Sequence, residues 1–381
     1  MTGRPGYRMR AGRLMRLAAL ILIVLACIAV AACTDQSIDA APGTIVRLTN
    51  DLDSQRYPSI DGDRIVWNHI SEERPAIVLY NITTGEKTEI PAHDSGRLQP
   101  PQISGDHVVW TDTRDPRSER SNRAVYLYTI STGERYFITS GTAQPDYPAI
   151  YSDYVVWEDK REKEGHESRD IYLYNILTEE ETAICTAPLD QRWPRIWEER
   201  VVWTDMRNGN YDIYLYNITT GEERALTSDP GDQTGPYIDR NRVIWTDLVS
   251  REIVLFNLTS NTGRVVSGSP SMKMGVSTSG DRIVWTDSVF RDSDTPDNDL
   301  HLLNLTEGRE MVVYPSRYHD QIHPVIAGDY IVWEEGGDIW LFEYEPGGSP
   351  PPAQDTPGFT ATITILSFSF FLMAWRRVRR R

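Results

Sequence analysis

Residues 200–217 read RVVWTDMRNGNYDIYLYN, and this stretch decides the fold. An apolar pair followed by Trp203 forms its first half, and the aromatic and β-branched run Ile213 to Tyr216 forms its second half. Such residues suit a pleated, packed strand. The apolar-Trp phrase occurs seven times, 40 to 48 residues apart, with its Trp at positions 67, 110, 157, 203, 245, 285 and 333. A fixed period built from short strands predicts a β-propeller.

Each repeat predicts four strands. In the fourth copy we expect them at residues 194–196, 200–204, 212–217 and 223–227. Thr220-Gly221 supplies the tight turn before the last strand, because Gly adopts the positive φ that such a turn needs. A single four-stranded blade cannot bury both of its apolar faces, so the blades must stack around an axis.

The seventh repeat is one strand short. It predicts strands at 323–327, 330–334 and 338–344, and then continues into Glu345-Pro346-Gly347-Gly348. Residues 44–49, ahead of the first repeat, read TIVRLT and resemble the fourth strands of the other copies. The sequence therefore predicts an all-β, seven-bladed propeller over residues 44–344, closed by its N-terminal strand. A six-bladed ring with one stray repeat is the alternative.

The N-terminal segment has the pattern of a secretory signal. Residues 1–16 contain five Arg and no acidic residue, and residues 17–32 are apolar. Small residues precede Cys33, which resembles a lipoprotein signal in which this Cys becomes the lipidated N-terminus. We predict a signal peptide over residues 1–33. An uncleaved anchor with an incidental Cys is the alternative.

The C-terminal segment carries a second signal. A Pro/Gly-rich spacer over residues 345–356 leads to Pro357, Gly358 and Phe359, and an apolar stretch over 359–375 precedes an Arg cluster. That stretch would form a transmembrane helix of about 25 Å, short for a hydrocarbon core of about 30 Å. The order resembles the C-terminal sorting signal of archaeal surface proteins handled by archaeosortases. The resemblance implies that residues 357–381 are a sorting signal whose tail is removed and replaced by a lipid, and it leaves open which end anchors the protein.

The charge distribution indicates where the propeller lies. The chain has 39 basic and 55 acidic residues, and the ends take ten basic residues and no acidic ones, so residues 34–355 have a net charge of −26. Arg clusters at both ends predict cytoplasmic flanks, with the propeller on the extracellular face of the cell membrane. An acidic body excludes nucleic acid as a partner, and the membrane is contacted only through the ends.

The chemistry-bearing motifs are few. Cys185 is the only Cys of the propeller, so no disulfide is expected within it, and we predict that this side chain is buried in a fourth strand. No phosphate loop, dinucleotide glycine pattern or CxxC pair occurs, so no cofactor is predicted. Residues 292–299 form an acidic loop that lacks the Gly and the closing Glu of an EF-hand. A solvated loop is favoured over a calcium site.

The repeat phrases resemble those of a known family. Gly-Asp precedes the second strand, as at Gly62-Asp63, the Trp-x-Asp phrase follows, and the run from Asp212 to Asn217 leads into the Gly221-Glu222 turn. These phrases resemble the propeller repeats of the TolB family and its archaeal surface relatives, over nearly all of 44–344. The resemblance implies binding or scaffolding, and it transfers no catalytic residue.

Five carboxylates follow a Trp at the same spacing. They are Asp112, Asp159, Asp205, Asp247 and Asp287, and Arg follows two places later in the second to fourth copies. One interpretation is a metal ring. We favour a structural brace, in which the Trp packs between sheets and the Asp accepts hydrogen bonds, because the first and seventh copies have His69 and Glu335 instead.

The joints between blades predict the ligand-binding surface. Aromatic and Arg side chains accompany a repeated Gln and Pro where each outer strand leads into the next inner strand, and these joints meet at one mouth of the ring. Aromatic and Arg side chains are typical of binding surfaces. The candidate ligand-binding residues are Arg56, Tyr57, Tyr147, Arg192, Trp193 and His323. The repeated Gln and Pro have the alternative role of fixing the joints.

The sequence thus predicts a non-enzymatic surface protein that binds a protein or a glycan at this mouth. The alternative is an extracellular polysaccharide lyase or hydrolase on the same fold, with His319 and His323 near the mouth. Four acceptor sequons for N-glycosylation lie at the ends of predicted third strands, at Asn81, Asn217, Asn257 and Asn304. We expect them on the face of the ring opposite this mouth. The alternative is that the repeat favours Asn and Thr here because they suit the turn that follows the third strand.

Overall fold

The computed structural model describes residues 39–93, 98–113, 123–139, 143–161, 168–267, 271–289, 297–314 and 320–351. The regular elements of these residues are strands, which form seven four-stranded antiparallel sheets. None of the described residues belongs to a helix long and apolar enough to cross a membrane. The predicted signal peptide with Cys33, the Pro357 to Phe359 tripeptide and the apolar stretch 359–375 lie outside these residues.

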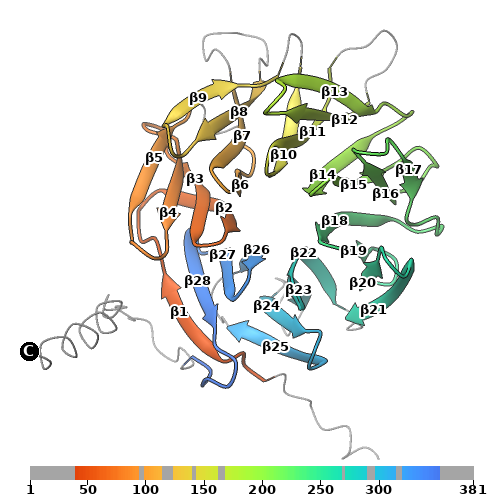
Figure 1. The fold of residues 1–381 in the computed structure, drawn as a ribbon. Helices are drawn as coiled ribbons and strands as arrows, with labels where there is room; N and C mark the ends of the chain where they lie inside the picture. The colour runs from red at the N-terminus through yellow and green to blue at the C-terminus, as the bar shows by residue number, and fades with distance from the viewer. Residues whose placement is uncertain are drawn as a thin grey trace, which may run out of the picture. The chain divides into compact units, whose positions relative to one another are not determined.

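The sheets follow one another along the chain as the blades of a propeller (Figure 1). Blades one to three are β2 (Ser54–Asp61), β3 (Arg64–Ile70), β4 (Ala76–Asn81) and β5 (Lys87–Pro91); β6 (Gln102–Ser104), β7 (His107–Thr113), β8 (Arg123–Thr129) and β9 (Glu134–Phe137); and β10 (Pro145–Tyr151), β11 (Tyr154–Asp159), β12 (Asp170–Asn175) and β13 (Glu180–Cys185).

Blades four to six continue in the same order, from the inner strand to the outer one. They are β14 (Gln191–Trp197), β15 (Arg200–Asp205), β16 (Asp212–Asn217) and β17 (Glu223–Ala225); β18 (Gln233–Asp239), β19 (Arg242–Asp247), β20 (Glu252–Asn257) and β21 (Thr262–Ser267); and β22 (Met272–Ser279), β23 (Arg282–Val289), β24 (Asp297–Asn304) and β25 (Arg309–Tyr314).

Blade seven closes the ring. It consists of β26 (Gln321–Ala327), β27 (Tyr330–Glu335), β28 (Asp338–Tyr344) and β1 (Gly43–Arg47). β1 pairs with β28 from Gly43 opposite Tyr344 to Arg47 opposite Trp340. The predicted closure by the N-terminal strand is therefore confirmed, and the six-bladed alternative is wrong.

The apolar core is divided among the blade interfaces. Seven clusters of buried side chains each join two neighbouring blades, including blades seven and one. The repeated Trp of every blade contributes to one of them and is at most 4% exposed. Burying a large aromatic side chain contributes roughly 2 to 3 kcal/mol. Because each interface needs a side chain from both blades, the blades stabilise one another around the ring.

The Trp-x-Asp phrase forms a brace within blades three and four. In blade four, Trp203 Nε1 donates to Asp205 Oδ2 at 2.8 Å, and Arg207 binds both Asp205 and Glu223 of the outer strand. The Arg207 guanidinium also lies 4.2 Å from the ring centre of Tyr214. Blade three repeats this arrangement with Asp159, Arg161 and Glu181. The brace interpretation is confirmed in these two blades.

Candidate functional site

The candidate residues lie at one end of the ring, which we call the mouth. Successive strands of each blade are antiparallel, so the inner strands all begin at the same end, where the preceding outer strand arrives. Figure 1 shows these inner strands gathered around the central axis. Arg56, Tyr57, Tyr147, Arg192, Trp193 and His323 all lie in the first few residues of inner strands.

The inner strands begin earlier than the sequence predicts. β14 starts at Gln191 rather than at Pro194, so the residues expected to form the joint are part of the strand. The reason is a β-bulge, which shifts the register between Arg192 and Arg195. The same shift occurs in every inner strand except β6, where Pro100 precedes Pro101.

The bulge places one residue per blade in the left-handed backbone region. That residue has φ between 48° and 63° and is Tyr57, Tyr147, Trp193, Gly235, Gly275 or His323. Gly adopts this conformation freely, whereas a bulky residue there costs about 1 to 3 kcal/mol. A Cβ atom placed on Gly235 would meet nothing within 4 Å, so this position of the bulge faces open space. Four of the six sequence-predicted residues therefore occupy strained positions at the mouth, and the other two, Arg56 and Arg192, directly precede such positions.

Blades seven and one form the first cluster, which we call the seven–one cluster. His323 Nδ1 lies 3.2 Å from Glu334 Oε2, and Arg56 Nε lies 3.8 Å from Glu334 Oε1. The Tyr57 ring packs against the His323 ring with 4.6 Å between centres. The Glu334 side chain is buried, whereas His323 and Arg56 are exposed. A buried carboxylate thus holds an exposed imidazole and guanidinium side by side.

Blades three and four form the second, three–four cluster. Glu158 Oε2 accepts a hydrogen bond from the Trp193 amide at 2.9 Å, and Glu158 Oε1 lies 3.0 Å from Arg169 Nε. Arg192 approaches the same carboxylate at 4.0 Å, and its guanidinium lies 5.1 Å from the Trp193 ring centre. Because Arg192 and Trp193 are half-buried, they present a partly exposed guanidinium and indole at the mouth.

The electrostatics of the three–four cluster are unusual. Burial raises the pKa of Glu158 to about 7, against the opposing effects of the Trp193 amide, Arg192 and Arg169. Burial also raises the pKa of the Tyr147 phenol, and the charges of Glu158, Asp146 and Tyr57 raise it further. The mouth therefore combines four aromatic or imidazole rings with Arg groups and a carboxylate that titrates near neutrality.

Sequence reasoning missed the two central carboxylates. Both follow the repeated Trp directly, a position that is Asn or Thr in the other blades. In blades one and six the small polar side chain bonds toward the next blade, Asn68 to Gln99 O at 3.2 Å and Thr286 to Gln321 O at 2.9 Å. Glu in place of Thr or Asn after Trp157 and Trp333 was the signal that could have revealed Glu158 and Glu334.

The repeated Gln has the structural role that was the alternative. Gln55, Gln191, Gln233 and Gln321 are at most 1% exposed. Gln55 accepts from Trp67 Nε1 at 2.8 Å, and Gln321 donates to Glu335 at 3.1 Å. Gln55 and Gln321 thus complete the brace of their own blade, and all four side chains are buried, so they are not available to a ligand.

Blade six contains the one group in the described residues with the composition of a metal site. Asp287, His301 and Glu310 bring ligand atoms within 4.8 Å of one another. His301 Nδ1 lies 2.9 Å from Glu310 Oε1 and its ring packs on Trp285, where blades three and four place Arg and Tyr. The buried Lys273 attracts Asp287 electrostatically, and burial lowers its pKa. A brace that uses His301 and Lys273 in place of the Arg and Tyr of blades three and four accounts for this group.

The sequons lie at the end of the ring opposite the mouth. Asn217 ends β16, which runs parallel to β14 within blade four, whereas Trp193 stands near the start of β14. Each Asn accepts backbone hydrogen bonds of the following turn, such as Thr220 N to Asn217 Oδ1 at 2.9 Å. The side chain of Asn304 is buried. The Asn residues therefore have a role in the turn, and glycan occupancy stays a prediction.

Comparisons with known proteins identify the fold. No protein-family model matches this chain, and no curated protein does. Among solved structures, an oligogalacturonate lyase from Vibrio parahaemolyticus is 13% identical with a TM-score of 0.61, covering 82% of this chain and 96% of that one. The propeller domain of the trilobed protease from Pyrococcus furiosus is 11% identical with a TM-score of 0.57, covering 78% and 95%. TolB from Acinetobacter baumannii is 17% identical with a TM-score of 0.49, covering 70% and 67%.

These likenesses show the fold alone. The chain is a seven-bladed β-propeller. The Pyrococcus domain is described as having an open velcro topology, whereas β1 supplies the outer strand of blade seven here. Proteins of this fold include enzymes such as the lyase, so the fold does not decide between binding and catalysis.

Proposed function

We propose that this propeller is a non-enzymatic binding protein whose ligand, a protein or a glycan, docks at the mouth. The seven–one and three–four clusters would contact it through Tyr57, Tyr147, Trp193 and the Arg side chains beside them. Rigid aromatic rings with adjacent guanidinium groups are the side chains that carry most binding energy at such surfaces. A protein exported with its ends in the membrane would present this mouth at the cell surface.

One observation carries the proposal. The bulge needs no side chain, because Gly235 and Gly275 satisfy it in blades five and six without strain. Blades one, three, four and seven nevertheless place Tyr, Tyr, Trp and His in the left-handed region. Strained bulky residues that persist where Gly would serve are typical of functional sites. We therefore infer that these four side chains serve to bind the ligand rather than to stabilise the fold.

The test compares stability with binding. Trp193→Gly relieves about 1 to 3 kcal/mol of strain and loses the packing of Trp193 against Tyr211 and Arg192, so we expect a change in stability within about 1 kcal/mol of zero. A glycan and protein array screened with the full-length chain should identify a ligand whose affinity falls roughly tenfold or more in this variant. Trp197→Phe, at the other end of β14, is the control and should retain binding. Equal binding by Trp193→Gly and the native chain would contradict the proposal.

A second candidate function rests on the seven–one cluster. His323, Arg56 and Glu334 converge there, and an imidazole positioned by a carboxylate beside a guanidinium suits general acid–base chemistry on an anionic or polyhydroxylated substrate. The Vibrio lyase, which shares the fold, acts on oligogalacturonate according to its name. Incubation with polyuronates should be monitored for unsaturated products in the ultraviolet. Activity lost in His323→Gln would establish the enzyme, and the absence of turnover on bound polymers would favour the binding function.

We further propose that the mature chain is a lipid-anchored surface protein. Residues 1–33 and 357–381 would be processing signals, and Cys33 or the Pro357 to Phe359 region would carry the lipid. Intact-mass measurement of the membrane-extracted native protein tests both ends. Persistence of residues 1–32 would contradict the lipoprotein signal, and persistence of residues 360–381 would contradict the sorting signal.

A further inference from the structure

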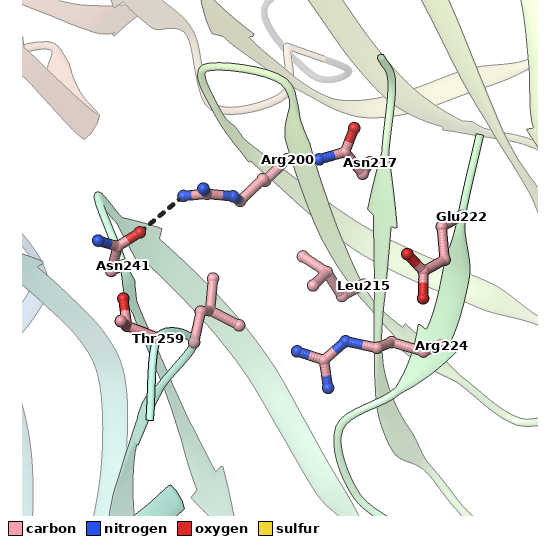
Figure 2. A pocket seen from close by; sticks show the side chains of 8 residues that line it. Arg200, Leu215, Asn217, Glu222, Arg224, Asn241 and Thr259 are labelled. Carbon is pink, nitrogen blue, oxygen red and sulfur yellow. Dashed lines mark hydrogen bonds between the residues drawn. The ribbon is translucent and has the colours of Figure 1, made fainter. Parts of the chain in front are cut away.

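Two cavities lie at the end of the ring opposite the mouth, at consecutive blade joints. The first, of about 270 Å³, lies between blades four and five and is drawn in Figure 2. The second, of about 340 Å³, lies between blades five and six. Both are lined by the residue that opens the second strand, by a central Leu and the terminal Asn of the third strand, and by a residue of the fourth strand.

The register of the strands shows what is particular to these two joints. Arg200 and Arg242 open second strands, and Arg64 and Arg282 do the same in blades one and six. The fourth-strand residue opposite the central Leu is Arg224 or Arg264 here. In the other five blades it is Thr88, Tyr136, Thr182, Met311 or Val46. Paired Arg residues therefore occur only at these two joints of the described ring.

The first Arg of each pair is structural. Arg200 donates to Arg240 O at 3.2 Å and to Asn241 Oδ1 at 2.9 Å, which joins blade four to blade five. Arg64 and Arg282 make equivalent bonds to Gly105 O and Gly328 O at other joints. The second Arg is not required by the fold, because Thr, Tyr, Met and Val replace it elsewhere. Arg224 reaches only Asn261 at 3.0 Å, and Arg264 has no hydrogen-bond partner among the described residues.

The side chains that line the two cavities indicate which class of ligand they could bind. Each contains two guanidinium groups and one carboxylate, Glu222 or Asp281, which leaves one positive charge in a strongly acidic body. Figure 2 shows Arg200 and Arg224 directed into the same space, with Leu215 between them. Paired guanidinium groups bind a carboxylate, Asn217 and Thr259 offer hydrogen bonds to hydroxyl groups, and the Leu side chains suit the apolar face of a sugar ring.

We propose that these two cavities are tandem subsites for the uronic acid units of an acidic glycan. Two equivalent subsites at consecutive joints fit a polymer with a repeated carboxylate, because the second unit binds at high effective concentration once the first is held. This role is separate from recognition at the mouth, which lies at the other end of the ring.

The experiment uses calorimetry on the full-length chain, produced in a host without N-glycosylation. The probes are an oligogalacturonate, the same oligomer with its carboxylates methyl-esterified, and sodium sulfate. We expect the acidic oligomer to bind and the ester to bind at least tenfold more weakly. Sulfate should compete only at high concentration. Arg224→Thr and Arg264→Met introduce residues that other blades have at this register, so they preserve the fold; each should weaken binding roughly tenfold, and the pair more.

Arg135→Thr, on the outer strand β9, is the matched control and should leave this binding unchanged, and Trp193→Gly reports whether the oligomer binds at the mouth instead. Equal binding of the ester, or native affinity in the double Arg variant, would overturn the proposal. A glycan attached to Asn217 or Asn257 in the native protein would also overturn it, because the glycan would fill the cavity. Loss of binding in Trp193→Gly alone would assign the oligomer to the mouth and refute the subsites.

Discussion

Thr49→Ala tests how the ring is held closed. Thr49 lies two residues after Arg47, the last paired residue of β1, and is 3% exposed. Its hydroxyl donates to Asp338 Oδ1 at 2.8 Å and accepts from Ile339 N at 2.9 Å. Arg47 pairs with the same Asp338. One buried hydroxyl thus ties the N-terminal strand to a residue almost the whole propeller away in sequence.

The magnitude follows from these two bonds. Each contributes about 1 kcal/mol, and the buried Ile339 amide loses its partner, so the variant should lose about 2 to 3 kcal/mol. Thr227→Ala is the matched control. Its hydroxyl makes the same two bonds within blade four, accepting from Ile213 N at 2.8 Å and donating to Asp212 at 3.2 Å.

The two variants should differ in local opening. β17 is connected to its own blade through the preceding strand, whereas β1 reaches blade seven only through space. Amide hydrogen exchange of residues 43–47 should therefore accelerate roughly 30- to 150-fold in Thr49→Ala and remain unchanged in Thr227→Ala. If global stability falls equally in both variants while exchange at β1 is unaffected, β1 opens only with the whole ring. That outcome would contradict the idea that Thr49 holds β1 onto blade seven.

Three further outcomes are expected. Asp205→Ala removes the buried acceptor of Trp203 and Arg207 and should lower the free energy of unfolding, measured by chemical denaturation, by about 3 to 5 kcal/mol. Asp247 has no Arg partner in its brace, so Asp247→Ala should lower it clearly less. Equal losses in the two variants would contradict the brace. Burial raises the pKa of Glu158 from its ordinary 4.5 to about 7, so the free energy of unfolding should fall as the pH rises from about 4.5 to 7. Glu158→Gln should remove this decline, which is on the order of 3 kcal/mol. Parallel pH profiles of the variant and the native chain would contradict the raised pKa. Burial raises the pKa of Cys185 to about 12, so mass spectrometry should find its peptide unlabelled by thiol reagents at pH 8 until the chain is unfolded, and rapid labelling of the native protein would count against that burial.

The repeat made much of the architecture predictable from sequence. Trp203, Asp205 and Arg207 lie within five residues of one another, so their brace depends on local spacing that the sequence displays. The closing strand was predictable because residues 44–49 have the pattern of an outer strand and the seventh repeat lacks one. The burial of Cys185 followed in the same way from its place in a fourth strand.

The bulge was not predictable in this way. Trp193, Tyr57 and His323 contradict local preference by adopting positive φ, and the Pro that follows each of them marks the position without predicting this conformation. The repeated Gln and Pro therefore predicted a joint between strands at Gln191 to Pro194, where the structure has the start of β14. Only the pairing of Arg192 with Thr204 and of Arg195 with Val202 shows that one extra residue is accommodated there, because Trp193 and Pro194 both lie opposite Trp203.

The sequence by itself determined the number of blades, the order of their strands, the strand that closes the ring and the brace inside blades three and four, because these depend on a repeated pattern and on neighbours within one repeat. The tertiary structure alone decided which residues of different blades meet. Glu158 reaches Trp193 and Arg192 across a blade joint, and Arg224 lies beside Arg200 and Thr259 in a cavity shared by two blades. Such contacts depend on the stacking of one sheet on the next, which has no counterpart in the spacing of residues along the chain.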